Sequence, residues 1–366
     1  MDPVSRLKLK RHLKGLFRWA LFLTVLWFVV VQARAQWQAS QGVEVSVNPG
    51  WLVLAGLTYL LSWIPSTWFW SHLIALLGER APVYPLLRAY YCGSLGKYVP
   101  GKAAVIVIRS AMLKEHGVSV VRASIASAVE AAAVMLVGLV VALAFALTVL
   151  PVGALPLDLP ELFRDQSTSW FALVAIVAVL VAAIPVLSVP ANWLFSFIAR
   201  SVAMREQMRS QTRPTDESGD ESAEPSPGAP PQKLTSGFLI AASLMFAVSW
   251  AIQGLSLLLV LRSMGTDVIS IDHWTVCTAA AAAGTSVGFF AVFAPGGLAV
   301  REGLIIAVLE PSMGGAIAVA GAGVLRMVSL GADCFSALVL YCVAPRKGGM
   351  TEGAEESATR PGDAVE

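Results

Sequence analysis

The sequence predicts an all-α fold: a polytopic helical bundle within a membrane, built as an inverted repeat with two re-entrant, Pro-Gly-broken hairpins. Hydrophobic residues make up 56% of the 366 residues and charged residues only 14%, whereas soluble proteins carry about 25% charged residues. Apolar runs of about twenty residues recur along the chain, and each could cross roughly 30 Å of hydrocarbon as a helix. Two further apolar segments are interrupted by Pro and Gly. The net charge of +2 gives no basis for a nucleic-acid partner, and none is expected.

Six apolar runs are expected to cross the membrane completely. The second contains Pro65 and is expected to be kinked. Tryptophan and tyrosine near several ends are typical of the membrane–water interface. The six runs are Leu16–Ala33, Trp51–Leu76, Ser119–Val149, Ser169–Val189, Leu234–Leu261 and Gly315–Cys342.

Lysine and arginine in the connections predict the orientation of the runs. Basic residues gather before the first run, in 79–122, in 200–233 and after the last run. The connections 34–50, 151–168 and 262–273 are poor in them. Because basic connections remain on the cytoplasmic side, the N-terminus, the central linker and the C-terminus are all expected to face the cytoplasm. We expect a multi-pass protein of the cell (inner) membrane.

Composition divides the chain into five parts. Residues 1–15 form a basic cytoplasmic N-terminus, and 16–203 contain the first membrane half and the start of the second. Residues 204–233 are a cytoplasmic linker whose part Thr212–Gln232 is rich in proline, serine and acidic residues, so it is expected to be disordered. Residues 234–345 complete the membrane part, and 346–366 form a second disordered tail.

Two interrupted segments are interpreted as re-entrant hairpins. Ala81–His116 is broken at Pro100-Gly101 and begins and ends on the cytoplasmic side by the charge rule. Ala279–Glu310 is broken at Pro295-Gly296-Gly297 and would enter from the opposite side. Inverted repeats with broken helices are the architecture of many transporters. The alternative makes Trp274–Pro295 a complete span, giving about seven crossings, but it leaves the C-terminal basic residues on the wrong side.

Two motifs resemble one protein family. SLGKYVPGK (Ser94–Lys102), followed by Arg109, Gly117 and Glu130, resembles the lysyl-phosphatidylglycerol synthase transmembrane region, also called the flippase-like domain family. APGGLAVREG (Ala294–Gly303) is similar to that family's second element, and Arg326 lies where the family tends to have arginine. Ala299 departs from the pattern, which has glycine there.

The resemblance implies an integral membrane protein that handles polar lipids. In two-domain members of the family, a soluble domain makes aminoacylated phosphatidylglycerol and the membrane part moves it between leaflets. This chain has no non-membrane stretch of ordinary domain size, so no synthase activity, and no enzyme activity, is expected of it.

Charged residues within the apolar runs and the residues at the two breaks are the candidate substrate-binding residues, because charges in hydrocarbon cost about 2.5–3.5 kcal/mol each and are functional candidates by default. The candidates are Lys97, Pro100, Gly101, Lys102, Arg109, Glu130, Pro295, Gly296, Gly297, Arg301, Glu302, Arg326 and Asp333.

The candidates divide by their expected environment. Glu130 is interpreted either as a headgroup or proton site, or as an interfacial residue paired with Arg109 or Arg122. Arg326 and Asp333 are seven residues apart, so they share a helix face, and they are expected to be partners, either in a cavity or in a structural ion-pair network.

The remaining cations lie beside the breaks. Lys97, Lys102, Arg109 and Arg301 flank half-helix ends whose N–H groups suit a phosphate. Anchoring at the cytoplasmic surface is the alternative for the first three. It does not suit Arg301, which is predicted to lie on the outer side.

No metal-ligand or nucleotide-binding spacing occurs, so no metal and no cofactor are expected. The leading hypothesis is a lipid flippase or transporter that handles a phospholipid or a polyprenyl-phosphate-linked lipid headgroup. Its expected partners are membrane lipids with anionic or phosphate-bearing headgroups. A first alternative is a non-transporting accessory protein that partners a lipid-modifying, cell-envelope or glycosylation enzyme. A second alternative is a membrane enzyme with its active site at Glu130, which lacks a visible nucleophile and base.

Overall fold

The computed structural model describes residues 47–98, 103–149, 204, 234–267, 270–290 and 299–343. These residues form α-helices, one short 3₁₀ helix and short connections, and no strand occurs among them. The predicted all-helical membrane fold is therefore confirmed. The linker (apart from Met204), the tail, and the predicted spans Leu16–Ala33 and Ser169–Val189 lie outside the described residues.

Four stretches in the described part of the chain are long and apolar enough to cross a membrane. The first consists of α2 (Pro49–Leu61) and α3 (Ile64–Leu76), which are separated by a turn at Ser62-Trp63 and have Pro65 in the first turn of α3. This turn gives the kink expected from Pro65, because proline fits the first turn of a new helix. The other three are α6 (Val120–Val149), α8 (Ser236–Ser263) and α11 (Gly315–Cys342).

Both interrupted segments fold as pairs of packed helices. In the first, α4 (Val83–Ser94) continues into the 3₁₀ helix η1 (Leu95–Tyr98) and packs against α5 (Ala103–Lys114). In the second, α9 (Ile271–Phe290) packs against α10 (Val300–Met313). The breaks Pro100-Gly101 and Pro295-Gly296-Gly297 lie outside the described residues.

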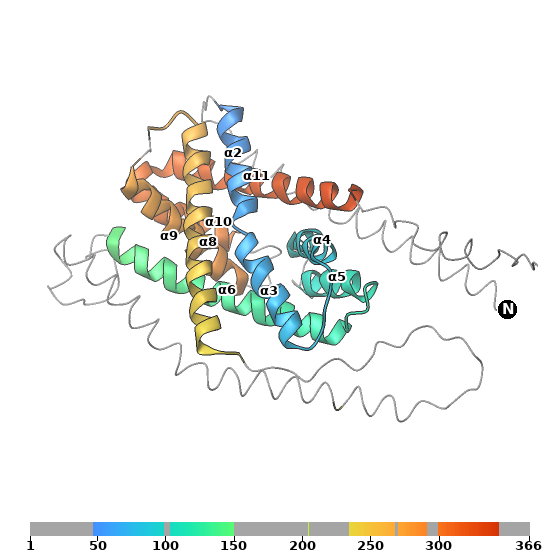
Figure 1. Ribbon diagram of the computed structural model, residues 1–366. Coiled ribbons are helices and arrows are strands. Elements are labelled where there is room, and N and C mark those ends of the chain that lie inside the picture. The colour runs from blue at the N-terminus through green and yellow to red at the C-terminus, as the bar shows by residue number, and fades with distance from the viewer. Residues whose placement is uncertain are drawn as a thin grey trace, which may run out of the picture.

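The two halves share one order of elements: a span, a helix pair and a second span. α2–α3, the pair α4/α5 and α6 form the first set, and α8, the pair α9/α10 and α11 form the second. Each pair places one helix against α6 and the other against α11, because α5 and α9 contact α6 while α4 and α10 contact α11 (Figure 1). This arrangement agrees with the predicted repeat. Its inversion across the membrane stays a prediction.

The spans of the two halves pack directly on one another. α8 contacts both α2 and α3, and α6 contacts α9. Close packing there depends on small residues, which let transmembrane helices approach. A Cβ at Gly138 of α6 would collide with the Ser286 hydroxyl of α9 and the Trp250 ring of α8. Gly138 therefore lets α6 pack closely against α8 and against α9 of the second helix pair.

Candidate functional site

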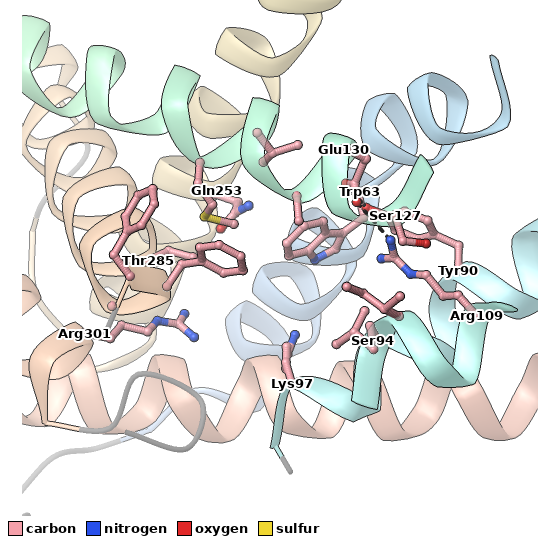
Figure 2. Close-up of a pocket in the computed structure, with 18 of the residues that line it drawn as sticks. Trp63, Tyr90, Ser94, Lys97, Arg109, Ser127, Glu130, Gln253, Thr285 and Arg301 are labelled. Atoms are coloured by element: carbon pink, nitrogen blue, oxygen red, sulfur yellow. Dashed lines mark hydrogen bonds and ion pairs between the residues drawn. The ribbon is translucent and has the colours of Figure 1, made fainter. Parts of the chain in front are cut away.

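A cavity of about 440 Å³ lies where the two helix pairs meet the central spans. Its wall takes residues from every described helix of both halves except α3. Apolar side chains such as Val134, Met135 and Phe290 form much of the wall. Figure 2 shows the polar side chains entering from different sides: Arg301 and Thr285 from one, Arg109 and Glu130 from the opposite one, and Lys97 between them.

Arg109 and Glu130 form a buried ion pair on the side of the first helix pair. Arg109 Nη1 lies 2.9 Å from Glu130 Oε2, and both residues are at most 5% exposed. The Tyr90 hydroxyl donates to Glu130 Oε1 at 2.8 Å, and its ring lies 3.8 Å below the Arg109 guanidinium. Of the two partners proposed for Glu130, the structure selects Arg109; Arg122 instead pairs with Glu79.

Glycine at position 93 makes room for this arrangement. A Cβ there would collide with Cγ of Arg109. Trp70 covers another side of the guanidinium, 5.3 Å from its ring centre, and donates its indole N–H to Ser127 at 2.9 Å. Arg109 is thus fixed by a carboxylate and two aromatic rings, which suit a planar cation.

Lys97 and Asp333 form a second charged cluster at the end of η1. The Lys97 ammonium pairs with the Asp333 carboxylate, which also accepts from Tyr98 at 2.7 Å and from Tyr59 at 3.3 Å. The ammonium lies 5.2–5.5 Å from the ring centres of Tyr59, Trp63 and Tyr98. Three aromatic rings and one carboxylate therefore surround this lysine, an arrangement typical of ammonium recognition.

Arg326 and Arg301 complete the charged wall. Arg326 Nη1 lies 3.5 Å from Glu302 Oε1, and both residues are buried. Arg301 is in the first turn of α10. A Cβ added at Gly288 of α9 would lie 3.0 Å from the Cβ of Arg301. Glycine at position 288 therefore lets the start of α10 pack closely against α9. Among the described residues, no carboxylate lies within ion-pair distance of Arg301.

The expected partnership between Arg326 and Asp333 is wrong. Arg326 pairs with Glu302 of α10, and Asp333 pairs with Lys97 of η1. Seven residues separate the two positions by about 10 Å along a helix axis, even though they share a face. Each charge therefore takes a partner from the helix pair that packs beside it.

The structure brings the candidates together to different degrees. Lys97, Arg109, Glu130, Arg301 and Arg326 line the same cavity. Asp333 and Glu302 lie behind its wall as partners of Lys97 and Arg326. The positions of Pro100, Gly101, Lys102, Pro295, Gly296 and Gly297 lie outside the described residues.

Several lining residues were missed at the sequence level. Gln253 of α8 lines the cavity and is 6% exposed, and its place within an apolar run is a signal that could have found it. Tyr59 and Trp63 lie in the middle of the span formed by α2 and α3, and nothing in the sequence sets them apart from the other aromatic residues of that span. Thr285 follows a run of alanines and resembles any small residue at a helix contact.

Metal ligands do not gather in the described part of the chain: no three histidine, cysteine or acidic side chains are placed to share an ion there. The expectation of no metal stays a prediction.

Comparison with known proteins identifies one family. The lysylphosphatidylglycerol synthase TM region matches residues 16–333. This range contains the cavity, both helix pairs and every candidate residue. A search of curated proteins finds no match.

Proposed function

The chain belongs to the lysylphosphatidylglycerol synthase TM region family, and from that premise we propose that it binds a membrane lipid with a phosphate-bearing headgroup and moves it between leaflets. The family is one of lipid-related membrane domains, and the chain has membrane-crossing helices. The site for the headgroup is the cavity between the two helix pairs. Binding and movement of the lipid involve no covalent step.

The single observation that carries the proposal is the charge of the cavity. Three cation–carboxylate pairs, Arg109–Glu130, Lys97–Asp333 and Arg326–Glu302, balance one another among the described residues. Arg301 is left as a surplus positive charge in the wall. Arg301 is partly buried, and a cation withdrawn from water is costly without an anion beside it. A phosphate oxygen is the acceptor that guanidinium groups bind best.

The position of Arg301 favours the same ligand. It lies in the first turn of α10, where the helix dipole adds positive potential. Apolar side chains elsewhere in the wall, including Val134 and Met135, suit the glycerol backbone or the beginning of an acyl chain. A cavity with one surplus cation and apolar walls matches the anionic phosphate and the apolar chains of a phospholipid.

Lipid transfer by purified protein tests this function. The full chain is reconstituted into vesicles containing a fluorescent lipid, and the fraction accessible to an external quencher is followed with time. We expect the wild type to equilibrate the lipid between leaflets and Arg301→Gln to slow this about tenfold or more, because a charge-assisted hydrogen bond is lost. The matched control is Arg262→Gln, which removes an arginine outside the cavity that pairs with Asp267.

The accessory-protein alternative gives a different result. If the chain is an accessory protein, the wild type should bind the phospholipid and Arg301→Gln should bind it more weakly. Neither the wild type nor Arg301→Gln should then move lipid between leaflets. Unchanged transfer by Arg301→Gln, with normal folding, contradicts the role given to the cavity.

A further inference from the structure

We infer that the cavity selects a headgroup that is both anionic and hydroxyl-bearing, such as glycerol phosphate or a sugar phosphate, and excludes the lysylated, cationic form. This inference rests on the proposed function and names the substrate class of the same site. It depends on two features: each carboxylate at or behind the described wall has a cationic partner, and neutral polar groups in the wall have hydrogen-bonding capacity left over.

A cationic headgroup needs a carboxylate or an aromatic cage as its partner. Glu130 is held by Arg109 and Tyr90, Asp333 by Lys97 and Tyr98, and Glu302 by Arg326. The aromatic cage is already occupied by the ammonium of Lys97 itself. The described wall therefore holds no carboxylate without a cation for an incoming ammonium group to pair with, and Arg301 repels that group.

Neutral polar side chains in the wall have hydrogen-bonding capacity left over. The hydroxyl of Thr285 and the indole N–H of Trp63 are buried and bond to nothing in the described residues. Gln253 is 6% exposed, and its amide makes no hydrogen bond within the same part of the chain. All three residues line the cavity. Buried polar groups are costly unless they are satisfied.

These groups suit hydroxyl groups of a ligand. A hydroxyl both donates and accepts, so it can satisfy the carbonyl and the NH₂ of an amide, another hydroxyl, or an indole N–H. In Figure 2, Thr285 and Gln253 lie in the same half of the view as Arg301, away from Arg109 and Glu130. A phosphate at Arg301 would therefore leave the hydroxyls of its headgroup facing Gln253 and Thr285.

Binding of three short-chain lipids by the full chain in detergent provides the test. The probes are phosphatidylglycerol, its lysylated derivative and phosphatidylethanolamine, with affinities read from the change in intrinsic tryptophan fluorescence. We expect phosphatidylglycerol to bind at least about tenfold more tightly than the lysylated form, since like charges brought together in a site oppose binding. Phosphatidylethanolamine, which carries no headgroup hydroxyl, should also bind more weakly than phosphatidylglycerol.

Variants of the neutral residues separate hydroxyl recognition from charge. Gln253→Leu and Thr285→Val should each weaken phosphatidylglycerol binding by about three- to tenfold, the worth of one hydrogen bond. Both should weaken phosphatidylethanolamine binding less, because its headgroup has no hydroxyl to lose a bond. The matched control is Ser249→Ala, which removes a buried hydroxyl one turn away on α8 that does not line the cavity. Melting temperatures without lipid identify any variant that fails to fold.

The outcomes separate this inference from the proposed function. Equal affinity for phosphatidylglycerol and its lysylated form, both lowered by Arg301→Gln, overturns the selectivity and leaves the phosphate site intact. Equal losses for phosphatidylglycerol and phosphatidylethanolamine in Gln253→Leu overturn hydroxyl recognition. Binding of no phospholipid by the folded wild type overturns the proposed function itself.

Discussion

The Lys97 ammonium of the first helix pair forms an ion pair with the Asp333 carboxylate of the last span. The contact joins the two halves of the chain, because η1 belongs to the first set of elements and α11 to the second. Asp333 is 1% exposed and also accepts hydrogen bonds from Tyr59 and Tyr98. The cluster therefore fixes the tip of the first pair against α11 at the edge of the cavity.

Replacing only one residue of the Lys97–Asp333 pair should lower stability more than replacing both. Lys97→Gln leaves Asp333 as a buried carboxylate without its cation, which should cost about 3 kcal/mol of stability. The double variant Lys97→Gln/Asp333→Asn should regain most of that loss. Thermal unfolding of the purified chain in detergent measures both. A double variant no more stable than Lys97→Gln would show that the tyrosine hydrogen bonds, rather than the charges, hold the cluster.

Much of the fold follows from hydropathy. The runs at Trp51–Leu76, Ser119–Val149, Leu234–Leu261 and Gly315–Cys342 appear as helices with ends shifted by only a few residues. A membrane enforces this agreement, since every backbone polar group in hydrocarbon must be bonded within its own helix. The two helix pairs were also predictable, because Pro and Gly interrupt otherwise apolar segments.

The charged residues of the site were predictable as a set, but their pairing was not. Arg109, Glu130, Arg301 and Arg326 stand out in apolar surroundings and do line one cavity. Partners depend on which helices pack side by side, and a shared face on α11 does not bring Arg326 to Asp333. The neutral residue Thr285 carries no such contrast with its neighbours, so only the packing of α9 reveals it.

Gly93 should control the position of Arg109. A side chain at this position would enter the space of the arginine stem, so Gly93→Val should displace Arg109 from Glu130 and destabilise the chain by about 1–3 kcal/mol, as overpacking does. The control is Gly331→Ala on α11, where no neighbour lies within 4 Å of an added Cβ. That variant should be neutral or slightly stabilising in the same unfolding measurement. Equal melting temperatures for Gly93→Val and wild type would contradict the close approach.

Replacing Ala299 with glycine should stabilise the protein. Ala299 precedes α10 with φ of 66°, the left-handed region that disfavours side chains, and this is the position at which the second motif departs from the family's glycine. Relief of the Cβ contact should contribute about 1 kcal/mol, opposed in part by the greater entropy of glycine in the unfolded chain. A raised melting temperature of Ala299→Gly is the expected result. A lowered one would mean that this entropy outweighs the strain.

The charge rule predicts the side of the membrane on which each connection lies. Reporters fused near Arg213 and after Lys347 should both read cytoplasmic, and one near Asp158 should read outside. If the reporter after Lys347 reads outside, α9 crosses the membrane completely and the second re-entrant hairpin is wrong. The packing of α9 against α10 is compatible with the hairpin, and the reporter decides its direction.

The pairing of Arg326 with Glu302 predicts different stabilities for two double variants, Arg326→Gln/Glu302→Gln and Arg326→Gln/Asp333→Asn. Arg326→Gln alone leaves Glu302, which is 7% exposed, without its cation and should lower stability by about 3–5 kcal/mol. Adding Glu302→Gln should restore most of the loss. Adding Asp333→Asn instead should deepen it, because that change leaves Lys97 without a carboxylate. Thermal unfolding of the three variants in one detergent separates the two pairings. Rescue by Asp333→Asn, with no rescue by Glu302→Gln, would restore the partnership expected from their shared helix face.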